Sequence, residues 1–318
     1  MTIHSSSIPL RIGTRGSPLA LAQAHEVRSR LGAAFAELSA PEAIQIVVLK
    51  TTGDLVQNRP LSEIGGKGLF TKEIDDAQLN GHIDLAVHSV KDVPTVLPDG
   101  IIMPCVLPRE DPRDAFLSLG VKTLADLPQG AVVGTSSLRR TAQVLLFRPD
   151  LRIAPLRGNV HTRLRKLEEG SIDATLLAVA GLRRLGLSEH ARFPLDPGVM
   201  LPAVAQGAIG VACRSEDDRA RRYLAGINDP VSMVRIVAER AFLAVLDGSC
   251  RTPIAALATV GPDGMLMLRG QIARPDGTKS FETTYAGASA DAEKMGQDAG
   301  RELLDRAGPG FFDFKQAQ

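Results

Sequence analysis

Short apolar segments alternate with stretches of helical periodicity over the first two hundred residues, and this alternation restricts the possible folds more than any other feature. It is typical of α/β proteins with a largely parallel sheet. The first unit predicts a strand at Leu10–Thr14 and then a helix with Ser17 as its N-cap and Pro18 as its first residue. Apolar side chains recur along this helix with helical spacing, at Ala20, Ala24, Val27 and Leu31.

The same pattern continues on both sides of a segment rich in proline and charge, residues 104–114. This segment indicates a hinge or linker. Two similar α/β units joined by a hinge favour a cleft between them, where ligands usually bind. Further strands are expected at Ile44–Leu49, Ile83–Val87, Ala131–Gly134, Leu151–Ala154 and Asp173–Ala178.

The pattern changes after about residue 228. A long helix is expected at Val231–Leu246, and a final helix at about Asp291–Arg306. Between them, two Pro-Asp-Gly turns separate strand-like segments and predict hairpins. These three segments are Ile254–Val260, Met265–Ile272 and Ser280–Tyr285. An antiparallel sheet with helices indicates a separate α+β domain.

Composition excludes several classes of function. A formal net charge of +1 gives no polybasic field for nucleic acid or membrane. The N-terminal residues lack the basic and apolar regions of a secretory signal, and no apolar run approaches the roughly 20 residues of a membrane span. The three cysteines are too few and too far apart for a disulfide framework or a zinc site. We expect a reduced cytoplasmic protein without a bound metal.

Positive charge is nevertheless concentrated in one segment. Gly134–Lys166 contains seven Arg and one Lys against a single acid, Asp150. Arg139, Arg140 and Arg157 follow expected strands, at the edge of an open α/β sheet where ligands bind. Arginine binds carboxylates in a bidentate manner, and helix N-termini attract anions. This pattern favours a ligand with several carboxylates or phosphates. Three other arginines of the segment are expected to be ordinary solvated charges, namely Arg148, Arg152 and Arg165.

Two further residues could carry chemistry. Asp92 follows an expected buried strand, and beside cationic side chains its carboxylate would stay ionised and could stabilise a cation. On its own, however, an Asp in a loop before Val-Pro is more often a turn residue. Cys250 lies in a Gly-rich loop after a helix, next to Arg251, which suits either a reactive thiol or a small buried side chain. Cys105 and Cys213 lie in strand-like segments and are expected to be buried and inert.

Nine short motifs, in the same order along the chain, resemble those of the porphobilinogen deaminase family. The stretches run over nearly the whole sequence: Arg11–Ala20, Gly65–Phe70, Ala86–Pro94, Glu110–Ala115, Gly134–Arg140, Leu156–Asn159, Ala178–Leu182, Pro202–Gly207 and Gly248–Cys250. The resemblance implies an enzyme that joins four porphobilinogen units head-to-tail into hydroxymethylbilane and releases ammonia.

The family resemblance also implies a domain arrangement. It consists of two α/β domains like the lobes of periplasmic binding proteins around a cleft, plus a smaller α+β C-terminal domain. The boundaries that we predict are residues 1–107 with 205–227 for domain 1, 108–204 for domain 2 and 228–318 for domain 3. The expected protein is a monomer.

The resemblance further implies roles for individual residues. Cys250 matches the position that holds a dipyrromethane cofactor through a thioether, and Asp92 matches the catalytic carboxylate. Lys67 and Phe70 fall in the family's active-site loop. Residues implied in cofactor binding are Lys91, Ser137, Arg139, Arg140, Arg163 and Arg184. Those implied in substrate binding are Arg15, Ser17, Arg157 and Gln206.

Two alternatives from other classes remain open at this point. A non-catalytic anion-binding protein would explain the two-lobed pattern, but not the third domain or the Cys250 loop. A phosphosugar or nucleotide transferase would explain the arginines. However, Gly65–Gly68 does not fit a P-loop, and no acidic pair for a metal is evident.

Overall fold

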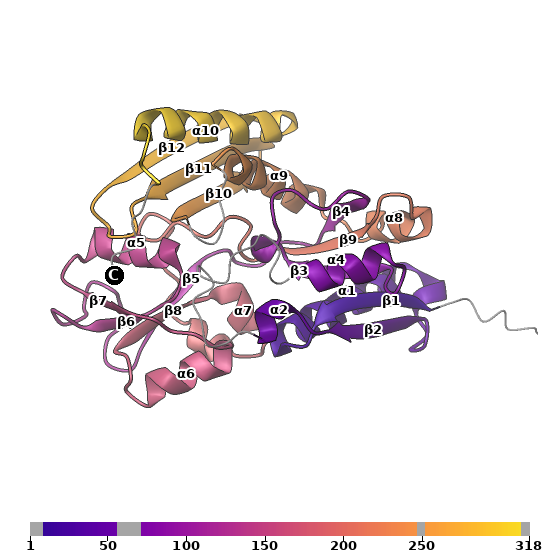
Figure 1. Cartoon of the computed structure of the whole chain (residues 1–318), viewed down its shortest axis with the longest axis horizontal. Coiled ribbons are helices and arrows are strands. Elements are labelled where there is room, and N and C mark those ends of the chain that lie inside the picture. The colour runs from indigo at the N-terminus through magenta and orange to yellow at the C-terminus, as the bar shows by residue number, and fades with distance from the viewer. Residues whose placement is uncertain (1–8, 56–70, 247–251, 313–318) are drawn as a thin grey trace, which may run out of the picture. The chain divides into compact units, whose positions relative to one another are not determined.

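The computed structural model describes residues 9–55, 71–246 and 252–312, and contacts divide them into two compact units. Unit 1 contains residues 9–55, 71–108 and 209–230, and unit 2 contains residues 109–208, 231–246 and 252–312. The chain thus leaves unit 1, returns to it once and leaves it again (Figure 1). The division into three domains stays a prediction.

Unit 1 is built on a five-stranded sheet with the strand order β2-β1-β3-β9-β4. Its strands are β1 (Leu10–Arg15), β2 (Ile44–Leu49), β3 (Leu85–Ser89), β4 (Ile101–Val106) and β9 (Ile209–Arg214). β1 pairs in parallel with β2 and β3, whereas β9 is antiparallel to both β3 and β4.

Helices cover the sheet of unit 1 on both faces. These helices are α1 (Pro18–Ala34), the short α2 (Thr52–Leu55), α4 (Lys72–Leu79) and α8 (Asp218–Ala225). The α1 residues Val27 and Leu31 belong to one core cluster with α8, and Ile74 of α4 belongs to another with Ala86. The predicted N-cap is confirmed, since Ser17 Oγ accepts a hydrogen bond from the backbone N–H of Ala20 at 3.3 Å.

Unit 2 contains a four-stranded sheet with the order β5-β8-β6-β7. Its strands are β5 (Asp114–Ser118), β6 (Val132–Gly134), β7 (Arg152–Ala154) and β8 (Ala174–Ala178). Its helices are α5 (Leu138–Phe147), α6 (Val160–Glu168) and α7 (Val179–Arg184). Val144 of α5 packs in one core cluster with Phe116, and Leu164 of α6 packs in another with Leu177, so that this sheet too is covered on both faces.

Each α/β sheet contains three adjacent parallel strands followed by one reversed strand, β9 in unit 1 and β5 in unit 2. The expectation of α/β sheets with mostly parallel strands is confirmed, but no sequence pattern indicated the reversed strands. Each reversed strand is the first strand that the chain forms after it passes from one unit to the other. No crossover helix of the same unit precedes it, so it is not bound by the βαβ rule that makes its neighbours parallel.

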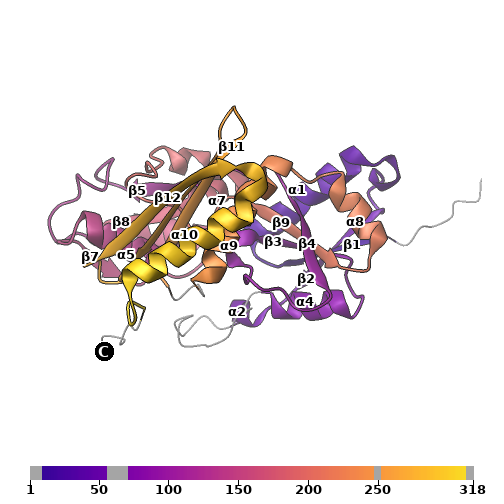
Figure 2. The same ribbon diagram turned by 90° about the horizontal axis from the view of Figure 1, so that it is seen from above.

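A third sheet in unit 2 has the order β10-β11-β12 and is antiparallel, as the hairpin signals predicted. Its strands are β10 (Ile254–Val260), β11 (Met265–Ala273) and β12 (Ser280–Ala288). The helix α10 (Ala292–Ala307) lies across β11 and β12, as Figure 2 shows. A second helix, α9, spans Pro230–Val245. Gly296 lets α10 approach α9 closely, because a Cβ there would lie 2.2 Å from the Ala238 carbonyl oxygen.

The segment predicted as a hinge is firmly attached to unit 2 from Arg109 onward. Arg109 donates its backbone N–H to Ser232 Oγ at 2.8 Å and forms a 2.6 Å ion pair with Glu239 of α9. Both side chains of the pair are almost completely buried. Pro104 and Cys105 belong to β4. The chain passes from unit 1 to unit 2 between Pro108 and Arg109, within the predicted linker, but the residues on both sides of this point are held in their own units.

In the part of the chain that the structure describes, no helix combines the length and apolar character needed to cross a membrane. The same residues contain no group of three or more His, Cys, Asp or Glu side chains that could hold a metal ion. Cys105 and Cys213 are buried without a disulfide, as predicted, and burial raises the pKa of the Cys105 thiol to about 12.

Candidate active site

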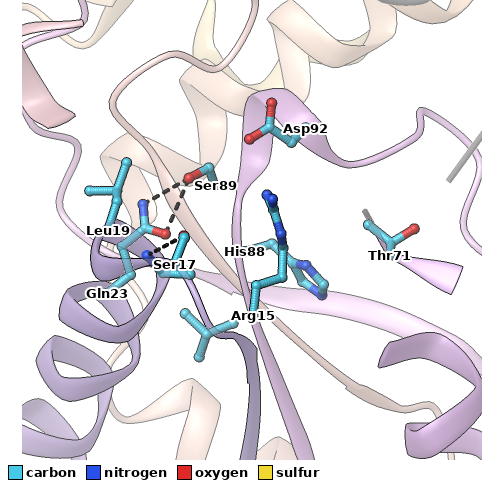
Figure 3. Close-up of a pocket in the computed structure, with 10 residues that line it drawn as sticks. Arg15, Ser17, Leu19, Gln23, Thr71, His88, Ser89 and Asp92 are labelled. Atoms are coloured by element: carbon cyan, nitrogen blue, oxygen red, sulfur yellow. Dashed lines mark hydrogen bonds between the residues drawn. The ribbon is translucent and has the colours of Figure 1, made fainter. Parts of the chain in front are cut away.

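Unit 1 contains a pocket of about 70 Å³ where β1 and β3 end. We call it the Asp92 pocket, and Figure 3 shows the side chains around it. Arg15 is the last residue of β1, and Asp92 ends the 3-10 turn Val90–Asp92 that follows β3. The residues that line it are Arg15, Ser17, Leu19, Ala20, Gln23, Thr71, Val87, His88, Ser89 and Asp92.

The Asp92 pocket places one exposed carboxylate beside one arginine. The Arg15 side chain extends from β1 toward Asp92 and passes next to His88 (Figure 3). Lys91, the residue before Asp92, is exposed as well. Three predicted site residues, Arg15, Ser17 and Asp92, thus line one pocket, although 77 positions separate Arg15 from Asp92 in the sequence (92 − 15).

His88 is a pocket residue that sequence reasoning missed. Its side chain is buried, with 8% exposure. Burial in the first place, and the positive charge of Arg15 in the second, lower the pKa of His88 to about 4. The imidazole is therefore neutral at pH 7 and adds no charge to the pocket.

Gln23 was also missed, and it joins α1 to the end of β3. Its side-chain amide forms hydrogen bonds with Ser89 Oγ at 2.9 and 3.1 Å. A signal for Gln23 existed in the sequence, because this polar residue lies on the apolar side of the predicted helix beside Ala20 and Ala24. A polar side chain on the buried face of an amphipathic helix needs a partner there.

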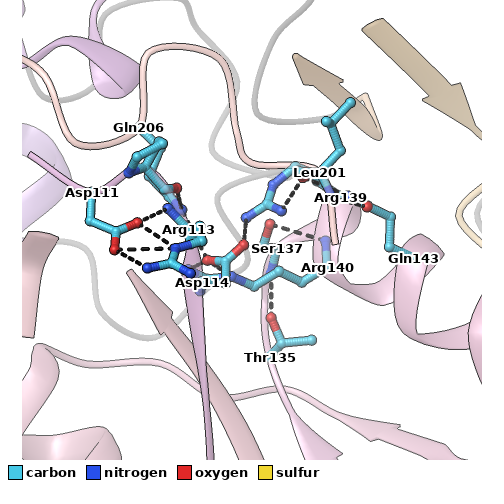
Figure 4. A network of polar contacts seen from close by, with 11 residues as sticks. Asp111, Arg113, Asp114, Thr135, Ser137, Arg139, Arg140, Gln143, Leu201 and Gln206 are labelled. Atoms are coloured by element: carbon cyan, nitrogen blue, oxygen red, sulfur yellow. Dashed lines mark hydrogen bonds and ion pairs between the residues drawn. The ribbon is translucent and has the colours of Figure 1, made fainter. Parts of the chain in front are cut away.

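Unit 2 contains a buried polar network around Asp114, which we call the arginine cluster: Asp114, Arg139, Arg140 and Gln206 (Figure 4). Asp114 is completely buried, and Arg139 and Arg140 are 5% and 6% exposed. The two guanidinium groups bind the carboxylate at 2.8 and 2.6 Å. Burial by itself would raise the pKa of Asp114, but the attraction of both arginines outweighs it and lowers this pKa well below its usual range.

The predicted residues Arg139, Arg140 and Gln206 are thus brought together, but as partners of an internal carboxylate. Gln206 is 1% exposed, and its amide donates to the Pro112 carbonyl at 2.8 Å and to Asp114 at 3.1 Å. Asp114 itself lies in a motif of the sequence analysis, but its role was not anticipated there.

The other predicted residues of unit 2 lie at helix ends and turns. Ser137 is the N-cap of α5 and accepts a hydrogen bond from the Arg140 backbone N–H. Arg157 is partly exposed and precedes Gly158, whose φ of 112° is rarely adopted by other residues. Arg163 donates to the Gly158 carbonyl at 2.9 Å, and Arg184 to the Gly207 carbonyl at 2.9 Å.

The remaining predicted site residues, Lys67, Phe70 and Cys250, lie outside the described residues. Their roles in the active-site loop and in cofactor attachment stay predictions.

Comparison with known proteins gives the family. Residues 10–222 match the family model "Porphobilinogen deaminase, dipyromethane cofactor binding domain", and residues 233–305 match "Porphobilinogen deaminase, C-terminal domain". The chloroplastic porphobilinogen deaminase of Pisum sativum is 59% identical over 98% of this chain and 85% of its own length.

A bacterial relative, the porphobilinogen deaminase of Paracoccus denitrificans, is 58% identical over 96% of this chain and 97% of its own length. Among solved structures, a TRAP periplasmic solute binding protein from Desulfovibrio salexigens aligns with a TM-score of 0.42 at 12% identity, over 70% of this chain and 72% of the other. The two family domains and the high identity over nearly the full length place this chain in the porphobilinogen deaminase family.

Proposed function

We propose that this chain joins four porphobilinogen molecules head-to-tail, releases one ammonia for each unit, and frees the product with one water molecule as hydroxymethylbilane. The observation that carries the proposal is the match of both family domains, at nearly 60% identity, over almost the whole chain. The Asp92 pocket is consistent with such a substrate, since it offers an accessible carboxylate and one arginine, Arg15.

The arginine cluster fits the carboxylate side chains of the family's dipyrromethane cofactor. Asp114 balances only one of two buried guanidinium charges, and Nε of Arg139 is buried without a partner among the described residues. An incoming carboxylate would balance the second guanidinium charge and accept a hydrogen bond from Arg139 Nε. When bound, dipyrromethane supplies the pyrrole carbon to which the first substrate unit is joined.

We propose that the cofactor's acidic groups are held by Lys91, Ser137, Arg139, Arg140, Arg163 and Arg184, with Cys250 as the covalent anchor. Ser137 offers a hydroxyl at the N-terminus of α5, where free backbone N–H groups also favour anions. Arg163 and Arg184 each hold a backbone carbonyl with one N–H group, which fixes the direction of the guanidinium.

Asp92 is proposed as the catalytic residue. Loss of ammonia from porphobilinogen leaves a positive charge shared between the methylene carbon and the pyrrole nitrogen. An ionised carboxylate stabilises this charge and accepts a hydrogen bond from the pyrrole N–H. The free α-carbon of the preceding pyrrole then attacks the methylene carbon, and its proton is released. The exposure of Asp92 at the end of β3 leaves its oxygens accessible to substrate.

We propose that the acetate and propionate groups of the substrate are bound by Arg15, Ser17, Arg157 and Gln206. Arg15 and Ser17 line the same pocket as Asp92, so a substrate carboxylate bound there would be close to the reacting atoms. A cytoplasmic location and a monomeric state are part of the proposal as well.

The proposal is tested by incubating the purified chain with porphobilinogen and measuring substrate consumption, ammonia and hydroxymethylbilane. Intact-protein mass should show an excess of two pyrrole units that is absent from Cys250→Ser. A chain that carries this excess but consumes no porphobilinogen would contradict the proposed reaction, and a chain without the excess would contradict the cofactor attachment.

A further inference from the structure

Both carboxylate oxygens of Asp114 are bound by donors inside the protein. Its carboxylate accepts N–H groups from Arg139 Nη2 at 2.8 Å and from Arg140 Nε and Nη2 at 3.1 and 2.6 Å. The Gln206 amide adds a fourth at 3.1 Å. Oδ1 accepts three of these hydrogen bonds and Oδ2 accepts one, and the side chain is completely buried, so that a ligand has no direct access to the carboxylate. Asp114 can therefore act on a ligand only through its partners.

The two arginines, in contrast, keep unused donors. Arg139 gives Nη1 to the Leu201 carbonyl at 2.8 Å and Nη2 to Asp114, but its Nε has no partner among the described residues. Arg140 uses Nε and Nη2 on Asp114, and the described residues provide no acceptor for Nη1. Each guanidinium is thus held from one side while a further N–H group stays available.

The charges of the arginine cluster do not balance. Asp114 contributes one negative charge and the two arginines contribute two positive charges, in a place where all three side chains are at most 7% exposed. A buried net charge is unfavourable unless an opposite charge approaches it. The described residues provide no second acid within ion-pair distance of Arg139 or Arg140.

From this arrangement we infer that Asp114 is a positioning residue, which orients Arg139 and Arg140 so that their remaining N–H groups and their excess charge receive a carboxylate of the cofactor or the growing pyrrole chain. Asp114 is the first residue of β5, and its partners come from the first turn of α5 and from the segment before β9 (Figure 4). A carboxylate held by a strand fixes flexible arginines before the ligand arrives, which reduces the entropy that binding costs.

The inference rests on the proposed function, and its test compares two buried carboxylates of unit 2. The variant is Asp114→Asn, and the matched control is Glu239→Gln. Glu239 is also fully buried and ion-paired, but with a single arginine, Arg109, so its ion pair is electrically balanced. Both variants remove one buried charge, and both are expected to lower thermal stability.

Two readouts separate positioning from mere stability. The first is KM for porphobilinogen, measured where each variant is fully folded. We expect Asp114→Asn to raise KM by about tenfold, the effect of losing one well-aligned hydrogen bond to a charged group, and Glu239→Gln to leave KM unchanged.

The second readout is the rise in unfolding midpoint that cofactor attachment produces. This rise is the unfolding midpoint of each protein minus the midpoint of the same protein with the additional substitution Cys250→Ser. We expect this rise to be smaller in Asp114→Asn than in the wild type and to be unchanged in Glu239→Gln, since bound ligand stabilises only in proportion to its affinity. Asp114→Glu, which restores the charge, should recover part of both effects.

A folded Asp114→Asn whose KM and cofactor-dependent rise equal those of the wild type would overturn the inference. If Asp114→Asn does not fold, Asp114→Glu decides. It keeps the charge but displaces the carboxylate from the two arginines, so a diminished cofactor-dependent rise supports the inference and an unchanged rise refutes it. A wild-type chain that binds no cofactor and consumes no porphobilinogen would instead refute the proposed function.

Discussion

The Asp92 pocket of unit 1 and the arginine cluster of unit 2 each place an aspartate beside arginine, yet one carboxylate is exposed and the other is buried. Asp92 is exposed at the end of a strand, next to Arg15. Asp114 is completely buried, and four N–H groups occupy it. A carboxylate that acts on a substrate must have accessible oxygens. A carboxylate that positions other side chains must instead have its oxygens bound by those side chains. Environment, and not residue type, separates the two roles.

The largest expected effect comes from Asp92→Asn, which removes the accessible charge and keeps the shape. We expect kcat to fall by at least about a hundredfold with little change in KM, because the charge matters most when the cation forms. Steady-state assays with porphobilinogen measure both constants. Asp84→Asn is the control. Asp84 also belongs to unit 1, but its ion pair at 2.7 Å is with Arg11. A normal kcat in Asp92→Asn would remove Asp92 from the catalytic role.

Glu239→Gln tests what a balanced buried ion pair contributes. Glu239 accepts N–H groups from Arg109 and from the backbone of Ala205 and Ala258. Its replacement leaves the Arg109 charge buried without a partner, so we expect a loss of about 3 kcal/mol in the free energy of unfolding. Urea denaturation measures this loss. If the folded Glu239→Gln variant lost as much activity as Asp114→Asn, charge balance would not distinguish structural clusters from ligand-binding clusters.

His88→Asn should change how stability depends on pH. The pKa of His88 is about 4 in the folded protein and about 6.5 in an unfolded chain. The unfolded chain therefore binds a proton first, and wild-type stability falls as the pH decreases from about 6.5 to 4. We expect His88→Asn to avoid a loss of up to about 3 kcal/mol over this range.

The measurement for His88 is urea denaturation of both proteins between pH 7 and pH 4, compared as a difference. The difference matters because burial raises the pKa of Asp75 to about 6, which gives this carboxyl the opposite effect in the same range. Asp75 is present in both proteins and cancels. A difference that does not grow toward pH 4 would contradict the low pKa of His88.

The smallest effect is expected from Arg165→Ala. Arg165 belongs to the same basic segment as Arg139 and Arg140, but it is exposed and pairs only with Glu169 at 3.6 Å. Such surface pairs contribute at most about 0.5 kcal/mol in helices. Thermal unfolding and KM should both match the wild type. A raised KM would mean that the binding surface extends along α6 beyond Arg163 to Arg165, and that exposed arginines of the segment bind ligand as well.

Local structure was predictable from the sequence where the signal is local. Ser17 caps its helix, β10 begins and ends at the predicted residues, and both hairpins are antiparallel. Each of these features depends on neighbours within a few residues. The reversed strands β5 and β9 were not predictable, because pairing partners come from distant parts of the chain.

The same distinction holds for the candidate site. The motifs indicated Asp92, Arg139 and Arg140, but nothing in the sequence indicated that Asp114 binds both arginines. Its partners lie 25 and 26 positions away, and they become neighbours only in the folded unit, where β5 pairs with β8. Arg148 was expected to be solvated, yet it donates to the carbonyls of Ala125 and Leu127 and holds that loop. A sequence pattern does not show which backbone carbonyls, distant along the chain, will accept hydrogen bonds from a side chain.

The place of β9 in the sheet of unit 1 has a consequence for synthesis on the ribosome. β9 lies between β3 and β4, although some hundred residues of unit 2 are made before it. A nascent chain that ends before residue 209 cannot join β4 to the rest of its sheet. The sheet that begins first is therefore not the first that can be completed, since all strands of the β5-β8-β6-β7 sheet precede β9 in the chain. The edges of β3 and β4 stay exposed to incorrect pairing until β9 emerges.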